Sequence, residues 1–83
     1  MTTKDIVLAI DQGTTGTTVV LVDAALSVIA KRNQEFKQHY PQPGWVEHDL
    51  EDIWRTVHQT IAAVLAESQV DPARIAAIGI TNQ

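Results

Sequence analysis

The sequence contains no cysteine, and this absence removes several kinds of chemistry at once. Without a thiol, the chain forms no disulfide, offers no thiolate ligand to a metal and carries no cysteine nucleophile. A cysteine-free chain is compatible with a reducing cytosol. Serine-based nucleophilic catalysis has no support either, because Ser27 and Ser68 lie in no recognisable motif with a general base.

Positive charge is also scarce, since the sequence has six Lys and Arg residues but ten Asp and Glu residues. The basic residues are scattered, so no stripe exists that could neutralise a nucleic-acid backbone. No hydrophobic run approaches the length of a membrane span, and residues 1–5 lack the features of a signal peptide. We therefore expect no nucleic-acid partner, no membrane partner and a cytoplasmic location.

What the sequence does contain is a Gly-Thr-rich loop between two apolar runs. Residues 6–10 and 19–22 are apolar, and Asp-Gln-Gly-Thr-Thr-Gly-Thr-Thr lies between them at 11–18. Two strands joined by a Gly-containing connection are typical of a β-hairpin. We expect Gly13 and Gly16 to allow a turn with positive φ, whose backbone N–H groups form an anion-binding concavity.

This loop places phosphate donors next to a carboxylate. We expect a nucleotide-phosphate site in which Asp11 holds a hydrated Mg²⁺ and the turn at Gly13, Thr14, Thr15 and Gly16 binds phosphate. A structural alternative stays open, because Gly, Thr and a capping Asp are common in hairpin turns. The loop is not a Walker loop, since no Gly-Lys-Ser/Thr follows, nor a dinucleotide fingerprint, since a strand follows its glycines.

The rest of the chain predicts one more strand, a helix and a final strand. Residues 28–36 are polar in their later part, which suits an edge strand. A loop with two prolines and a glycine follows at 39–48, and we expect Trp45 to pin it to the domain. A helix is predicted from about residue 50 to 67 after the N-cap Asp49.

The apolar residues of this helix recur on one stripe: Leu50, Ile53, Trp54, Val57, Ile61, Val64 and Leu65. Residues 75–80 are apolar on both faces and predict the last strand. A right-handed crossover returns this strand parallel to the first. The predicted fold is therefore α/β, with a mixed sheet β-β-β-α-β in the order 3-2-1-4.

Three blocks of this sequence together resemble the FGGY carbohydrate kinases. They are residues 11–15, residues 40–49 with Ile53-Trp54 after them, and residues 78–83. The resemblance implies the ribonuclease H-like fold of actin, hexokinase and sugar kinases, with residues 1–83 as a partial N-terminal kinase domain. The blocks are most similar to the branch that phosphorylates glycerol. Another sugar or polyol kinase of the family is the alternative.

The resemblance implies ATP as phosphoryl donor, Mg²⁺ held by Asp11 through water, and terminal phosphates contacted by the turn at residues 13–16. Glycerol would be the acceptor in the complete enzyme. In the family an Arg directed at the nucleotide stands where this sequence has Thr18, which offers no long cationic donor. The family's substrate-binding Arg-Glu pair is expected after Gln83. We therefore assign no catalytic or substrate-binding residue and expect the fragment alone to be inactive.

The predicted architecture leaves apolar surface uncovered. One helix covers one face of a four-strand sheet, so the other face and the edge of the last strand stay open. We expect a homo-oligomer through this face or edge. A stand-alone interaction module without enzyme activity is the alternative from another class. His39, His48 and His58 show no metal-ligand spacing, so we expect solvated or capping roles for them.

Overall fold

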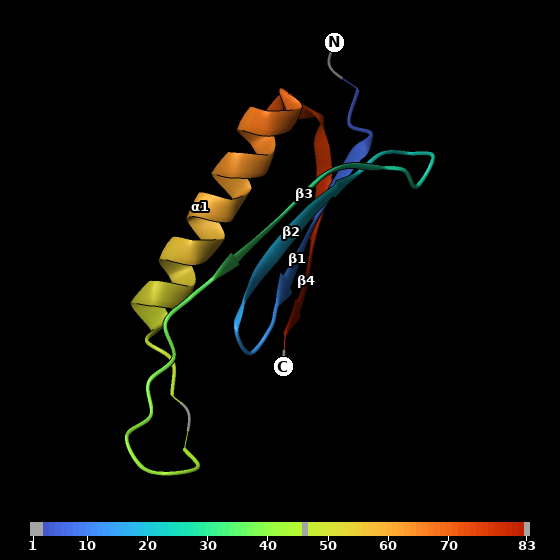
Figure 1. Ribbon diagram of the computed structural model, residues 1–83. Coiled ribbons are helices and arrows are strands. Elements are labelled where there is room, and N and C mark those ends of the chain that lie inside the picture. Colours follow the sequence, from blue (N-terminus) through green and yellow to red (C-terminus); the bar gives the residue numbers. More distant parts are fainter. Residues whose placement is uncertain (1–2, 46, 83) are drawn as a thin grey trace.

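The computed structural model describes residues 3–45 and 47–82 as one sheet with one long helix (Figure 1). The elements are β1 (Ile6–Gln12), β2 (Gly16–Val22), β3 (Val28–Glu35), α1 (Leu50–Ser68), the 3₁₀ turn η1 (Pro72–Arg74) and β4 (Ile75–Asn82). The four strands lie in the order β3-β2-β1-β4. β1 is antiparallel to β2 and parallel to β4, so the predicted mixed sheet is confirmed.

The first hairpin is tighter than the sequence suggested. β1 continues through Asp11 to Gln12, and β2 already begins at Gly16. Only residues 13–15 remain as the turn. Asp11 therefore lies within a strand, where it pairs with Thr18 on one side and Thr81 on the other.

The helix begins and ends at the capping residues expected from local chemistry. The Asp49 carboxylate accepts a hydrogen bond from the backbone N–H of Glu51 at 2.9 Å, as an N-cap residue does. At the other end, Gln69 adopts a left-handed conformation with φ 57°, and its N–H donates to the carbonyl of Leu65. The predicted helix thus ends within a residue of its observed end.

The hydrophobic core lies between α1 and one face of the sheet. Alternating β1 residues Ile6, Leu8 and Ile10 are buried on this face. Val19 and Leu21 of β2 and Val64 of the helix complete its centre, each fully buried. Odd-numbered β1 residues therefore face away from the helix.

The predicted apolar stripe of the helix is confirmed in part, because Val64 is buried and Val57, Ile61 and Leu65 pack against the core. Thr56, Thr60 and Val64 are its buried residues, whereas Leu50 and Trp54 are 79% and 63% exposed. The two threonine hydroxyls donate to the carbonyls of Asp52 and Thr56 at 2.6 Å, so their burial leaves no unpaired hydroxyl.

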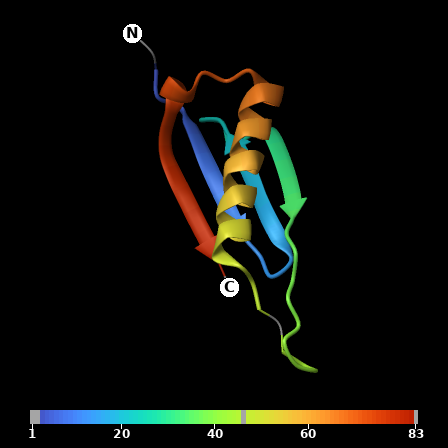
Figure 2. The ribbon, with the colours of Figure 1, turned by 90° about the vertical axis from the view of Figure 1, so that its left-hand side faces the viewer.

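The helix covers only part of the sheet face on which it lies. It packs over β2 and β3, and Figure 2 shows β4, in red, uncovered beside it. A groove between α1 and β4 is lined by apolar side chains that include Trp54, Ile61, Ile78 and Ile80. Apolar surface is therefore exposed on the helix side of the sheet as well as on the far side, where Val7 is 42% exposed.

The loop that leads into the helix projects from the body of the domain (Figure 1). Its backbone forms a bridge between His39 and Glu47. The prediction that Trp45 pins this loop is wrong, because its side chain is 55% exposed. Among the residues that the structure describes, no helix has both the length and the apolar character needed to cross a bilayer.

Candidate functional site

The Gly-Thr turn is held by its own backbone. The N–H of Gly13 donates to the carbonyl of Gly16 at 2.9 Å, and the N–H of Phe36 donates to the carbonyl of Thr15 at 3.1 Å. The positive φ expected at Gly13 or Gly16 is not found, since Gly44 is the one glycine with positive φ in the described ranges. The turn therefore lacks the left-handed residue of the expected anion-binding concavity.

A row of polar side chains crosses the open face of the sheet beside this turn. Strand pairing aligns Asn33, Thr18, Asp11 and Thr81, one from each strand. The Asn33 amide donates to the Thr18 hydroxyl oxygen at 2.7 Å. Asp11 is the only carboxylate in this row, and it is exposed.

The donor set of this row fits a magnesium ion. Hard divalent cations take carboxylate and hydroxyl oxygens or hold their own water against such groups. Asp11 supplies the carboxylate, and Thr18 and Thr81 lie beside it on the neighbouring strands. The arrangement suits a hydrated cation better than a fully protein-ligated one.

A second polar row occupies the helix side of the sheet, one residue further along. It consists of Gln34, Thr17, Gln12 and Asn82. Thr17 is fully buried, and its hydroxyl donates to Gln12 Oε1 at 2.9 Å. Gln34 donates to Gln59 of the helix at 2.6 Å.

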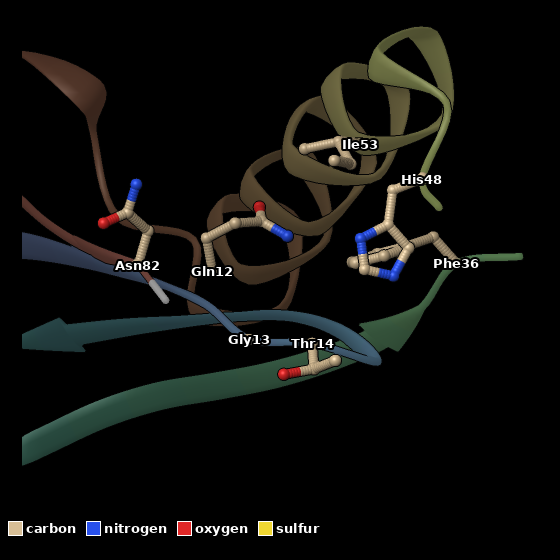
Figure 3. Close-up of a pocket in the computed structure, with 7 residues that line it drawn as sticks. All are labelled: Gln12, Gly13, Thr14, Phe36, His48, Ile53 and Asn82. Atoms are coloured by element: carbon tan, nitrogen blue, oxygen red, sulfur yellow. The ribbon is translucent and has the colours of Figure 1, made fainter. Parts of the chain in front are cut away.

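This second row borders a cavity of about 460 Å³ between the turn and the start of α1. Figure 3 shows Gln12 and His48 on facing sides of the cavity, with Ile53 above and the turn below. His48 packs edge-on against Phe36, with ring centroids 4.8 Å apart. Gln12 Nε2 and His48 Nε2 are buried and have no hydrogen-bonding partner.

The sequence-predicted residues do not all meet at this cavity. Gly13 and Thr14 line it, whereas Asp11 lies on the opposite face of β1. Sequence reasoning missed Gln12, His48 and Asn82 as cavity residues. For Gln12 a signal was present, because the alternation that buries Leu8 and Ile10 continues to residue 12 once the strand is extended.

The fold also gathers three potential metal ligands that the sequence spacing did not reveal. One ligand atom each of His39, Asp49 and Asp52 lies within 4.8 Å of the others. Both carboxylates already have donors, however. Asp49 caps the helix, and Asp52 accepts from Arg55 Nη2 at 2.6 Å. The cluster is thus explained by capping and ion pairing at the helix start.

Comparison with known proteins identifies the family. The model of the FGGY family of carbohydrate kinases, N-terminal domain, matches residues 6–83. The chain belongs to the FGGY carbohydrate kinases. It is 53% identical over 81 residues to a glycerol kinase of Carboxydothermus hydrogenoformans, which covers 98% of this chain and 16% of that protein. A glycerol kinase of Brucella ovis is 53% identical over 77 residues, which cover 93% of this chain and 16% of that protein.

Solved FGGY kinase structures share the fold. A xylulose kinase from Rhodospirillum rubrum superposes with a TM-score of 0.84 at 26% identity, covering 94% of this chain and 16% of that one. The Plasmodium falciparum glycerol kinase with ADP superposes with a TM-score of 0.81 at 27% identity, and the match covers 100% of this chain and 17% of that one. The predicted actin/hexokinase-like fold is confirmed. This FGGY chain spans about one sixth of the length of the curated relatives that it matches.

Proposed function

We propose that residues 1–83 are a partial N-terminal domain of an ATP-dependent glycerol kinase. The observation that supports this proposal most is the 53% identity to a glycerol kinase over 98% of the chain. The reaction would transfer the γ-phosphoryl group of ATP to a hydroxyl of glycerol. Such transfer depends mainly on positioning and on stabilising the charge of the transferred group.

In this proposal the open face beside the turn is the nucleotide side of the site. Asp11 would hold Mg²⁺ through water, and the turn at Gly13, Thr14, Thr15 and Gly16 would contact the terminal phosphates. The ion would supply charge neutralisation of the phosphoryl oxygens. Because the Gly13 N–H is already used within the turn, phosphate contacts would come from other groups of the turn.

Thr18 would take the position at which the family has an Arg. Its hydroxyl oxygen accepts from Asn33, so its own proton is available for donation along the row. A neutral hydroxyl attracts phosphate less than a guanidinium does. We therefore expect weaker nucleotide binding than an Arg at this position would give.

The complete reaction would require more polypeptide than these residues. The chain spans only 16% of its first relative, so we propose that the chain alone binds ATP weakly and transfers no phosphate. Use of ATP supports a cytoplasmic location, which stays a prediction.

A chimera tests the proposed function. Residues 1–83 would replace the matching segment of the Carboxydothermus hydrogenoformans glycerol kinase, and formation of glycerol 3-phosphate would be measured. We expect activity, and we expect Asp11→Asn to reduce kcat/KM by about 100-fold because a carboxylate near the transferred charge is lost. Glu67→Gln, at an exposed carboxylate on the helix, is the matched control. A folded chimera without activity would contradict the proposal.

Another FGGY sugar kinase is the second candidate. The structural similarity to a xylulose kinase, with a TM-score of 0.84, favours it, whereas sequence identity favours glycerol kinase. Assaying the protein encoded by the complete reading frame with glycerol and with xylulose separates the two. A clear preference for xylulose would select the second candidate.

We further propose that the isolated chain forms a homo-oligomer through β4 and the neighbouring groove. β4 contains no charged residue and no proline, unlike the edge strand β3 with Lys31, Arg32 and Glu35. Charges on an edge discourage strand pairing, and their lack permits it. The exposed Ile78 and Ile80 beside the edge add apolar area to such an interface.

A further inference from the structure

The last strand of the sheet presents an unpaired backbone edge. β4 ends the order β3-β2-β1-β4, and it pairs with β1 on one side. Within the described residues no other strand reaches its outer edge, which lies beside the helix and not under it in Figure 2. The outward N–H and C=O groups of such an edge are a template for another strand. This edge therefore fits a partner with an extended backbone.

The composition of β4 allows that partner to be a second copy of the chain. The chain carries a net charge of -4, yet no residue of Ile75–Asn82 is charged. Two copies of this edge therefore meet without like charges facing each other, which destabilise a strand pair when they lie directly opposite. The edge is compatible with itself, although the chain as a whole repels its copies.

Two identical edges can pair in antiparallel orientation about a two-fold axis perpendicular to the sheet. Each copy then uses the same edge, and the assembly closes as a dimer. Both helices lie on the same face of the joined sheet. They do not collide, because α1 packs over β2 and β3 and the strands β1 and β4 of both copies lie between the two helices.

This symmetry restricts the register. Directly opposite residues in a ladder point to the same face, so the two-fold axis passes through a residue and not between two. Two registers then give nearly full overlap of β4, centred on Ile78 or on Gly79. The centre at Gly79 places Ile78 of each copy opposite Ile80 of the other. The centre at Ile78 instead places Ile80 opposite Ala76.

The side chains of β4 favour the centre at Gly79. Ile78 and Ile80 are 59% and 72% exposed on the helix side, where both line the groove beside α1. In this register each isoleucine gains a β-branched neighbour across the strand pair, which stabilises a ladder. Gly79 lies on the other face, where a Cβ atom would meet nothing within 4 Å.

We propose that two copies of the chain pair antiparallel through β4, centred on Gly79, to form one continuous sheet. The proposal rests on the self-association proposed above, and it specifies the partner strand, the symmetry and the register. It requires no kinase activity, so the chimera experiment does not bear on it.

Disulfide crosslinking tests the register directly, because the sequence contains no cysteine of its own. In the proposed dimer the two Cα atoms of residue 79 lie about 5 Å apart, which is within disulfide range. Gly79→Cys should therefore form a covalent dimer on mild oxidation. Its added side chain meets open space, so the variant should fold as the parent does.

Ala77→Cys is the matched control on the same face of β4. Its two copies would lie about 13 Å apart along the strands, too far for a disulfide. This variant should stay uncrosslinked. The double variant Ala77→Cys/Thr81→Cys should crosslink, because residues 77 and 81 lie opposite each other in the proposed register.

A charged variant tests the same position without oxidation. Gly79→Asp places two carboxylates opposite each other at the two-fold axis, so the dissociation constant of the dimer should rise about fivefold at low salt. Gly79→Asn, of similar size but neutral, should change it less than about twofold. Equal dissociation constants for the two variants would overturn the proposed centre.

Sedimentation of the parent chain shows which proposal fails. An oligomeric parent without a crosslink in Gly79→Cys would overturn the strand pair and leave self-association standing. Equal crosslinking in Gly79→Cys and Ala77→Cys would also overturn it, because random collision gives that result. A parent that stays monomeric at micromolar concentration would overturn both proposals.

Discussion

A Cβ atom on Gly16 would lie 2.6 Å from the carbonyl oxygen of Gln34 on the neighbouring strand. The same atom would lie 3.0 Å from the Cα of Glu35, so both obstacles belong to backbone. Gly16 is therefore needed for close approach of β2 to β3, and not for a positive φ.

The first prediction concerns this contact. Gly16→Ala should destabilise the chain by about 1–3 kcal/mol, because overpacking against backbone forces the strands apart. Gly13→Ala is the matched control, since its Cβ would lie 3.4 Å from the Gly16 carbonyl, an ordinary contact. Its effect should stay within about 0.5 kcal/mol. Urea unfolding measures both, and equal losses in the two variants would contradict the argument.

The second prediction concerns the pair of Asp5 and Arg74, which joins the chain before β1 to the start of β4. Arg74 Nε and Nη2 donate to the two Asp5 carboxylate oxygens at 3.1 and 2.9 Å, and the Asp5 N–H donates to the Arg74 carbonyl at 3.1 Å. Hydrogen bonding to the guanidinium lowers the pKa of Asp5 below its ordinary value of 3.8.

A lowered carboxyl pKa means that the unfolded chain takes up the proton first as pH falls. The pair should thus stabilise the fold fully above pH 3.8 and lose its effect below that pH. Asp5→Asn should unfold at slightly lower urea at pH 7 and should lose less stability between pH 5 and pH 2 than the parent. The loss should be small, because the pair is partly exposed. If the free energy of unfolding depended on pH in the same way in both proteins, the argument that the Asp5 pKa is linked to stability would be refuted.

The third prediction concerns the end of α1. Gln69 adopts φ 57°, a left-handed conformation that costs a residue with a Cβ about 1 kcal/mol. Gln69→Gly should therefore stabilise the chain by up to about 1 kcal/mol. Ala66→Gly, within the helix, should instead cost about 1 kcal/mol. The melting temperature should rise in Gln69→Gly and fall in Ala66→Gly. A lower melting temperature for Gln69→Gly would count against the prediction.

The fourth prediction concerns self-association. The isolated chain should sediment above monomer mass at micromolar concentration. Ile80→Lys, at an apolar side chain that is 72% exposed beside the open edge, should shift the chain towards monomer. Val28→Lys, at a side chain that is 61% exposed on the opposite edge strand, should not. A monomeric parent chain would remove the proposed interface.

Local patterns in the sequence were sufficient to predict most of the fold. The apolar runs at residues 6–10 and 75–80, together with the N-cap Asp49, located two strands and the start of the helix correctly. The prediction was less accurate at the hairpin, where Asp11 and Gln12 were assigned to a loop although they lie in β1. The reason is that polar residues such as Asp are also typical of turns, so a polar strand end resembles the start of a loop.

Burial on the helix was harder to predict from the sequence. Its apolar stripe included Leu50 and Trp54, which are exposed, and omitted Thr56 and Thr60, which are buried. A threonine becomes compatible with the core once its hydroxyl bonds to a carbonyl four residues earlier. Which residues face the sheet then depends on where the helix lies across it.

The sequence by itself determined the strands, the helix, the order of the sheet and the family resemblance, because alternation, helical periodicity and capping are properties of neighbouring residues. Only the tertiary structure decided that Gln12 meets His48 at one cavity. Their meeting depends on strand register and on the path of the loop into α1, which bring together residues that are 36 positions apart in the chain. No local pattern carries that information, because it arises from packing across the sheet.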